Sequence, residues 1–189
     1  SWARDVYKRQ GYMDVVGLSK NEIENVVANL GTSLTDKQIL TLNQFFDDII
    51  ICFDGDESGY KAALRAAENS IKELKPEKQI SFLFLPDQED PDSFVNKNGK
   101  NFFIDFSKQS KIPIHQFIFS HYKKQTENNP SSMAIFEKKL KQIANSIKDD
   151  YIKKYVLEYF LEKIDELTPH SNQSKNNFNY KKTIKSLER

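Results

Sequence analysis

Hydrophobic residues follow two patterns in the first half of the chain. Apolar residues fill 49–53, dominate 80–85 and are frequent over 25–30, which is typical of strands buried on both faces of a sheet. Between them, apolar residues recur every three or four positions over 36–46 and 60–74, which predicts two amphipathic helices. Because strands alternate with helices, the pattern predicts an α/β fold with a parallel sheet flanked by helices.

Local signals mark where the shorter elements begin. Thr35 is a favourable N-cap, and Gln38 three residues later completes a capping box. Residues 11–16 have the pattern of a strand end that turns into a short helix over 15–21, although Gly17 lies inside that helix.

Only helical patterns continue from Ser110. Pro113 suits the first turn of a helix, and 128–132 has the composition of a loop. We therefore expect an α/β domain over 11–109, a small all-α helical subdomain over 110–168 and a linker-like tail over 169–189. The apolar stripes of the subdomain are Ile114, Phe117, Ile118 and Tyr122; Met133, Phe136, Leu140, Ile143 and Ile147; and Ile152, Val156, Tyr159, Phe160 and Ile164.

Residues 1–10 show neither a hydrophobic period nor a helix cap. We interpret them as a non-native or truncated leader without a regular element.

Composition and charge exclude several classes of function. No apolar run is long enough to span a bilayer, and the single cysteine, Cys52, cannot form an internal disulfide. One Cys and three scattered His exclude a structural zinc site. Residues 1–100 carry 12 Lys/Arg and 17 Asp/Glu, whereas residues 101–189 carry 16 and 10. A basic helical half suits a protein that meets phosphates, although a solvated helix surface gives the same pattern.

Two carboxylates follow the run at 49–53 at once, Asp54 and Asp56. In open α/β sheets ligands bind beyond the carboxyl ends of the strands, and two acids this close repel each other unless a cation lies between them. Oxygen ligands without His or Cys favour Mg²⁺ or Mn²⁺. The alternative is that the aspartates only cap the helix that follows.

A second acidic turn, Glu89-Asp90-Pro91-Asp92, follows the run at 80–85. Because adjacent parallel strands end at the same edge of a sheet, we expect Asp90 and Asp92 to lie near the first pair. Asp14 adds a carboxylate at a third strand end.

Other candidate residues give weaker signals. Gly31-Thr32-Ser33 could cradle a phosphate, but it lacks the P-loop pattern. The histidines, His115, His121 and His170, are isolated along the sequence, and we assign them no role.

Four motifs together resemble the catalytic core of bacterial DnaG-type DNA primases, specifically its Toprim domain and the helical subdomain that follows. The resemblance covers Gly11 to about Leu167. An Asp-x-Asp alone is shared with topoisomerases and Toprim nucleases, whereas Gly-Tyr-Met-Asp-Val and Glu-Asp-Pro-Asp indicate primase. The motifs are Gly11-Tyr12-Met13-Asp14-Val15, Leu30-Gly31-Thr32-Ser33-Leu34-Thr35, Phe53-Asp54-Gly55-Asp56-Glu57-Ser58-Gly59 and Phe84-Leu85-Pro86-Asp87-Gln88-Glu89-Asp90-Pro91-Asp92.

The resemblance implies a nucleotidyltransferase that synthesises short RNA primers during bacterial DNA replication, in the cytoplasm. It implies that Mg²⁺ or Mn²⁺ is held by Asp54, Asp56, Asp90 and Asp92, with Asp14 close by. The partners implied are a single-stranded DNA template, ribonucleoside triphosphates and the RNA primer. The replicative helicase would bind through a domain outside this chain, and no membrane is involved.

Gln10 departs from the family, which has a glutamate directly before Gly-Tyr-Met-Asp as a general acid/base or metal-site residue. An amide neither takes nor gives a proton near neutral pH, so we expect residues 1–10 to replace native sequence. The family's zinc-binding domain, the basic N-terminal half of its polymerase core and its helicase-binding domain are absent from this chain. We therefore expect this chain to be inactive by itself.

Three alternatives stay open. Another Toprim-type phosphoryl transferase, a nuclease or topoisomerase, would need a Tyr nucleophile or further acids. A haloacid-dehalogenase-type phosphatase also begins with a strand and Asp-x-Asp, but the sequence 54–59 fits it poorly. A non-catalytic fragment that binds nucleic acid or a replication partner is favoured by Gln10 and by the basic C-terminal half.

Overall fold

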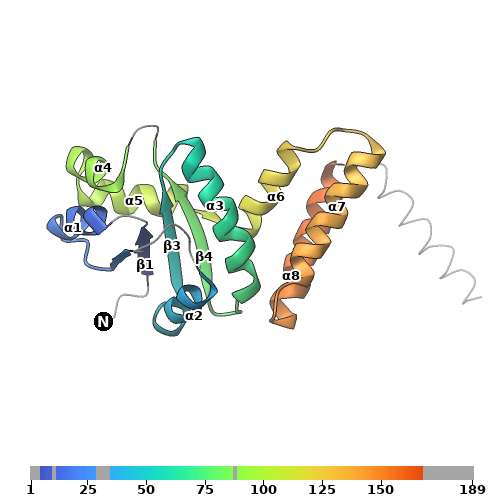
Figure 1. Cartoon of the computed structure of the whole chain (residues 1–189), viewed down its shortest axis with the longest axis horizontal. Helices are drawn as coiled ribbons and strands as arrows, with labels where there is room; N and C mark the ends of the chain where they lie inside the picture. The colour runs from blue at the N-terminus through green and yellow to red at the C-terminus, as the bar shows by residue number, and fades with distance from the viewer. Residues whose placement is uncertain (1–4, 10–11, 29–34, 87–88, 168–189) are drawn as a thin grey trace, which may run out of the picture.

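The computed structural model describes residues 5–9, 12–28, 35–86 and 89–167. Strands and helices alternate through the first half, and helices follow one another in the second (Figure 1). In chain order the elements are β1 (Asp5–Arg9), α1 (Tyr12–Lys20), β2 (Val26–Ala28), α2 (Asp36–Phe45), β3 (Asp48–Phe53), α3 (Glu57–Ser70), the 3₁₀ turn η1 (Ile71–Glu73), β4 (Gln79–Phe84), α4 (Pro91–Asn98), α5 (Lys100–Ser110), β5 (Ile112–Pro113), α6 (Ile114–Lys124), α7 (Pro130–Asn145) and α8 (Asp150–Leu167).

The strands form one sheet in the order β2-β1-β3-β4-β5. The first four are parallel, which confirms the predicted α/β arrangement, and β5 pairs antiparallel with Ser81 and Phe82 of β4. The sheet is therefore mixed rather than parallel throughout. Pro113 closes β5 instead of lying in the first turn of a helix, because a proline favours extended backbone in the residue before it.

Strand β1 corrects the expectation that residues 1–10 contain no regular element. It lies between β2 and β3 and pairs with both. Its sequence, Asp-Val-Tyr-Lys-Arg, lacks the continuous apolar run that is typical of a central parallel strand, so the hydrophobic pattern did not reveal it. The origin of residues 1–10 stays a prediction.

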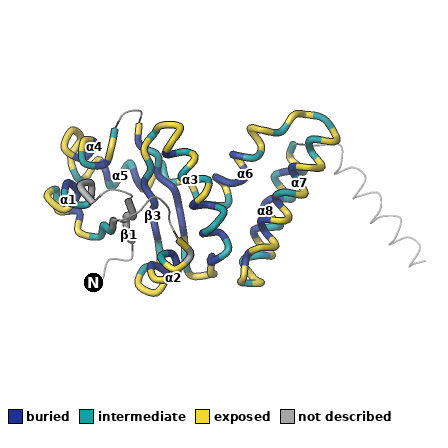
Figure 2. The backbone as a smooth tube through the Cα atoms, in the orientation of Figure 1, coloured by how far each residue is buried: buried dark blue, intermediate teal, exposed yellow. Residues whose placement is uncertain are grey.

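The sheet separates two hydrophobic clusters, because successive side chains of a strand point to opposite faces. On β3, Ile49 and Ile51 belong to the cluster with α2, α3 and α6, whereas Ile50 and Cys52 belong to the cluster with α1, α4 and α5. Figure 2 shows β3 buried along its length between these two layers.

The cluster on the α3 side continues into the helical subdomain. Helix α6 packs on α3 and β4, and α7 and α8 lie beyond it as an antiparallel pair (Figure 1). The three predicted stripes are confirmed, since Phe117, Leu140 and Phe160 lie in one continuous core.

A polar contact joins η1 of the α/β domain to the loop between α7 and α8 of the helical subdomain. The Lys148 backbone amide donates to the Lys72 carbonyl at 3.1 Å, and the Lys148 ammonium pairs with Glu73, whose side chain is 5% exposed. Within the described residues, no helix is both long and apolar enough to cross a membrane.

The shared core predicts that substitutions at two positions of α7 change the free energy of unfolding by very different amounts. Leu140→Ala is expected to lower the free energy of unfolding by about 2–5 kcal/mol, because Leu140 is fully buried and its loss leaves a cavity. Ile135→Ala is the control, since Ile135 is 68% exposed, and its effect should stay within about 0.5 kcal/mol. Urea denaturation measures both, and equal effects would contradict the described packing.

Candidate functional site

The two predicted acidic turns leave the sheet side by side. Strands β3 and β4 are in register from Asp48 and Gln79 up to Phe53 and Phe84, and the Leu85 amide donates to the Phe53 carbonyl at 3.2 Å. The segments that follow β3 and β4 therefore begin at the same edge of the sheet.

Asp56 is the N-cap of α3. Its Oδ1 accepts a hydrogen bond from the Gly59 amide at 2.7 Å, and its backbone is extended. Asp56 therefore caps this helix, which explains why α3 begins at Glu57 rather than at Tyr60. A carboxylate has two oxygens and about four acceptor positions, so capping through Oδ1 leaves Asp56 further capacity as a ligand.

Gly59 is required by a close approach of the backbone. A Cβ at this position would lie 2.2 Å from the Asp54 carbonyl oxygen, which is far inside van der Waals contact. The turn from Asp54 to Gly59 can therefore fold over the start of α3 only because residue 59 has no side chain.

Asp90 is likewise the N-cap of its helix, α4. Its Oδ1 accepts from the Ser93 amide at 2.7 Å, and the Asp90 amide donates to Ser93 Oγ at 3.0 Å, which completes a capping box behind Pro91. Ser93 Oγ also donates to Glu89 at 2.6 Å, and Lys97 lies 2.9 Å from the same carboxylate. The hydrogen bond from Ser93 holds the pKa of Glu89 below its usual value, and the hydrogen bond from Lys97 adds to this shift.

Asp92 connects α4 to α1. Its Oδ1 accepts from Asn96 at 2.9 Å, and a Cβ on Gly17 would lie 2.0 Å from that oxygen. Asn21 donates to Asn96 Oδ1 and to the Gly17 carbonyl, each at 3.0 Å. Sequence reasoning missed these contacts, although a glycine inside a helical pattern was the available signal for a close approach.

Asp54 and Asp56 follow the end of β3, and Asp90 and Asp92 lie at the start of α4, the next helix after β4. No group of three His, Cys, Asp or Glu that could hold a metal occurs in the part of the chain that the structure describes. Asp14 lies on α1, but its side chain is outside the described set. Gln10 and the proposed phosphate loop, Gly31, Thr32 and Ser33, lie outside the described residues.

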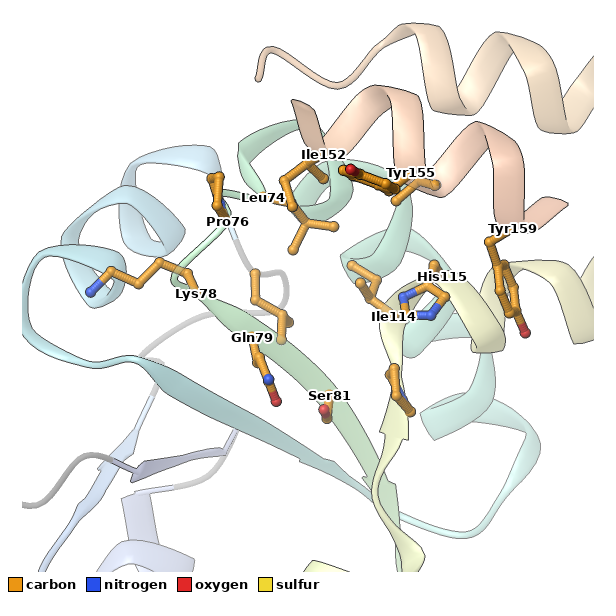
Figure 3. Close-up of a pocket in the computed structure, with 13 residues that line it drawn as sticks. Leu74, Pro76, Lys78, Gln79, Ser81, Ile114, His115, Ile152, Tyr155 and Tyr159 are labelled. Atoms are coloured by element: carbon orange, nitrogen blue, oxygen red, sulfur yellow. The ribbon is translucent and has the colours of Figure 1, made fainter. Parts of the chain in front are cut away.

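A separate cavity of about 360 Å³ lies away from these acids, between β4, β5 and α8 (Figure 3). Its lining includes His115, Tyr155 and Tyr159 together with several apolar side chains. The predicted site residues are not part of this lining. Burial lowers the pKa of His115, whose ring packs edge-on against Tyr159.

Comparison with known proteins places the chain beside bacterial primases. Residues 10–84 match the family model described as a Toprim domain. DNA primase from Legionella pneumophila is 38% identical over 148 residues, which are 78% of this chain and 24% of the relative. DNA primase from Rickettsia typhi is 36% identical over 156 residues, 82% of this chain and 26% of the relative.

Solved primase structures share the fold. The E. coli primase catalytic core matches with a TM-score of 0.81 and 32% identity, over 86% of this chain and 52% of that one. A DnaG primase catalytic domain bound to single-stranded DNA matches with a TM-score of 0.80 and 31% identity, over 85% and 52%. The chain thus spans about a quarter of these curated relatives and about half of these solved chains.

The contact at Gly59 predicts a stability change opposite to helix propensity. Gly→Ala inside a helix normally stabilises by about 1 kcal/mol. Gly59→Ala is instead expected to lower the free energy of unfolding by about 1–3 kcal/mol, because the methyl group overlaps the Asp54 carbonyl. Ser58→Ala, at the exposed neighbouring position, is the control and should have little effect. Thermal denaturation distinguishes them, and a more stable Gly59→Ala would contradict the close approach.

Proposed function

Because this chain belongs to the DnaG-type DNA primase family, with the Toprim domain and the helices that follow it, we propose that it works in the synthesis of short RNA primers for DNA replication. The reaction would be nucleotidyl transfer that joins ribonucleotides on a single-stranded DNA template. The relatives named above are primases rather than nucleases or topoisomerases, which favours this proposal over the other Toprim chemistries.

One observation carries the proposal: two acidic turns leave neighbouring parallel strands at one edge of the sheet. All of their ligand atoms are carboxylate oxygens, which suit Mg²⁺ or Mn²⁺. Magnesium is commonly held by one or two carboxylates together with water and substrate phosphates, so an open arrangement fits this ion better than a closed cage would. The donor set thus fits the cation that the family implies.

The residues in this role would be Asp54, Asp56, Asp90 and Asp92, with Asp14 nearby. A bound divalent cation would supply charge for the triphosphate leaving group and acidify the attacking 3′ hydroxyl. The chain's own contribution is positioning: the Gly59 amide orients Asp56, and the Ser93 amide orients Asp90.

The partners proposed for this site are single-stranded DNA, ribonucleoside triphosphates and the RNA primer, in the bacterial cytoplasm. A related catalytic domain has been solved with single-stranded DNA. The excess of Lys and Arg over residues 101–189 supports contact with phosphates. We further propose that the whole primase meets the replicative helicase through a domain outside this chain, and that Gly31, Thr32 and Ser33 contact a phosphate.

A calorimetric titration of Mn²⁺ tests the cation site directly. Asp54→Asn/Asp56→Asn is expected to weaken binding about tenfold or more, because two ligand charges are lost. Asn caps helices as well as Asp, so α3 should persist in this variant. Asp105→Asn/Asp150→Asn removes two exposed carboxylates elsewhere and is the matched control. Equal binding by all three proteins, or none by the folded parent, would refute the proposed site.

Gln10 offers a second test of the same site. Since the family has glutamate at this position, Gln10→Glu is expected to tighten Mn²⁺ binding several-fold by adding a ligand charge. The titration is repeated under the same conditions, with Gln38→Glu as a control for the added charge. Unchanged affinity in Gln10→Glu would mean that this position does not face the cation.

A further inference from the structure

Tyr60 reaches three parts of the molecule that surround the acidic turns. Its backbone amide donates to the Asp56 carbonyl at 3.0 Å, so it belongs to the first turn of α3. Its ring lies 5.9 Å from that of Phe84 at the end of β4 and 5.3 Å from that of Phe117 on α6. The side chain therefore touches the end of β4 and the helical subdomain, while the backbone of the same residue belongs to the first acidic turn.

His121 on α6 holds the outer end of this side chain. Tyr60 Oη lies 3.1 Å from His121 Nδ1, and Gln125 Nε2 lies 3.2 Å from His121 Nε2. An amide nitrogen only donates, so His121 Nε2 accepts and the neutral ring carries its hydrogen on Nδ1. The Nδ1–H group then donates to Tyr60 Oη. Sequence analysis assigned His121 no role because Tyr60 is distant along the chain and Gln125 belongs to no motif.

Burial, rather than the charges nearby, favours the neutral form of His121. Burial lowers the pKa of His121, Glu68 on α3 opposes this shift and Lys124 on α6 reinforces it. Glu68 already accepts from the Tyr122 hydroxyl and pairs with Lys139 of α7 at 3.3 Å. The charge of Glu68 is therefore shared with Tyr122 and Lys139. His121 itself is only 8% exposed.

We propose that Tyr60 and His121 are positioning residues that brace the first acidic turn against the helical subdomain and so hold Asp56 in place for a cation. The cation part of this inference rests on the proposed function, whereas the brace itself can be measured without a metal. Neither residue touches the reacting atoms in this account, since both act through the start of α3.

Protonation of His121 would change only its contact with Gln125, because Nδ1–H donates to Tyr60 Oη in both forms of the ring. A charged imidazole donates from both nitrogens, so its Nε2–H would face the donor amide of Gln125. The contact with Gln125 is complete while the ring is neutral, and because burial lowers the pKa of His121, this contact is lost only as the pH falls through that lowered pKa.

Hydrogen exchange of the Gly59 amide reports on the brace, because this amide donates to Asp56 Oδ1. Tyr60→Phe keeps the ring and removes the hydroxyl, and it is expected to lower the protection of Gly59 about fivefold in the metal-free chain. Protection of the buried Leu140 amide on α7 should not change. Tyr151→Phe, at a residue 75% exposed on α8, is the matched control.

A Mn²⁺ titration completes the test. Mn²⁺ affinity should fall about fivefold in Tyr60→Phe. Unchanged Gly59 protection in Tyr60→Phe would overturn the brace whether or not the parent binds Mn²⁺. A braced chain that binds no Mn²⁺ would instead refute the proposed function and the cation part of the inference.

Discussion

Strand β3 is the constraint on which the rest of the structure depends. It pairs with β1 along one edge and with β4 along the other, and apolar residues cover both of its faces. A slip of one residue would exchange its two faces, and both clusters would lose their central members. The same pairing that fixes the register also decides where the strand stops, and so where the first acidic turn begins.

The elements with continuous apolar runs or clear caps could be predicted from the sequence. The capping box of Thr35 and Gln38 is present as expected, and β3 and β4 lie within one residue of their predicted ends. Strand β1 could not be predicted, because its polar residues do not show the pattern of a central strand. Strand β5 was missed because two residues give no period to detect.

The candidate site was predicted in part. Placing Asp54 and Asp90 after neighbouring strands needs only the rule that parallel strands end at one edge. The contacts that fix the acids are different, since Gly17 against Asp92 and Tyr60 against His121 join residues far apart in the sequence. No local pattern contains that information, because it arises only when the helices pack. The proposed metal site therefore depends on tertiary packing as well as on the acids themselves.

Helices α3 and α4 both begin at an aspartate of the candidate site. The start of a helix carries about half a positive elementary charge, so each carboxylate is partly neutralised by the backbone behind it. The acids therefore repel one another less than free carboxylates would. The same neutralisation weakens the attraction for any one ion. An edge built in this way would favour rapid exchange of the proposed cation over its permanent retention, which suits the proposed nucleotidyl transfer.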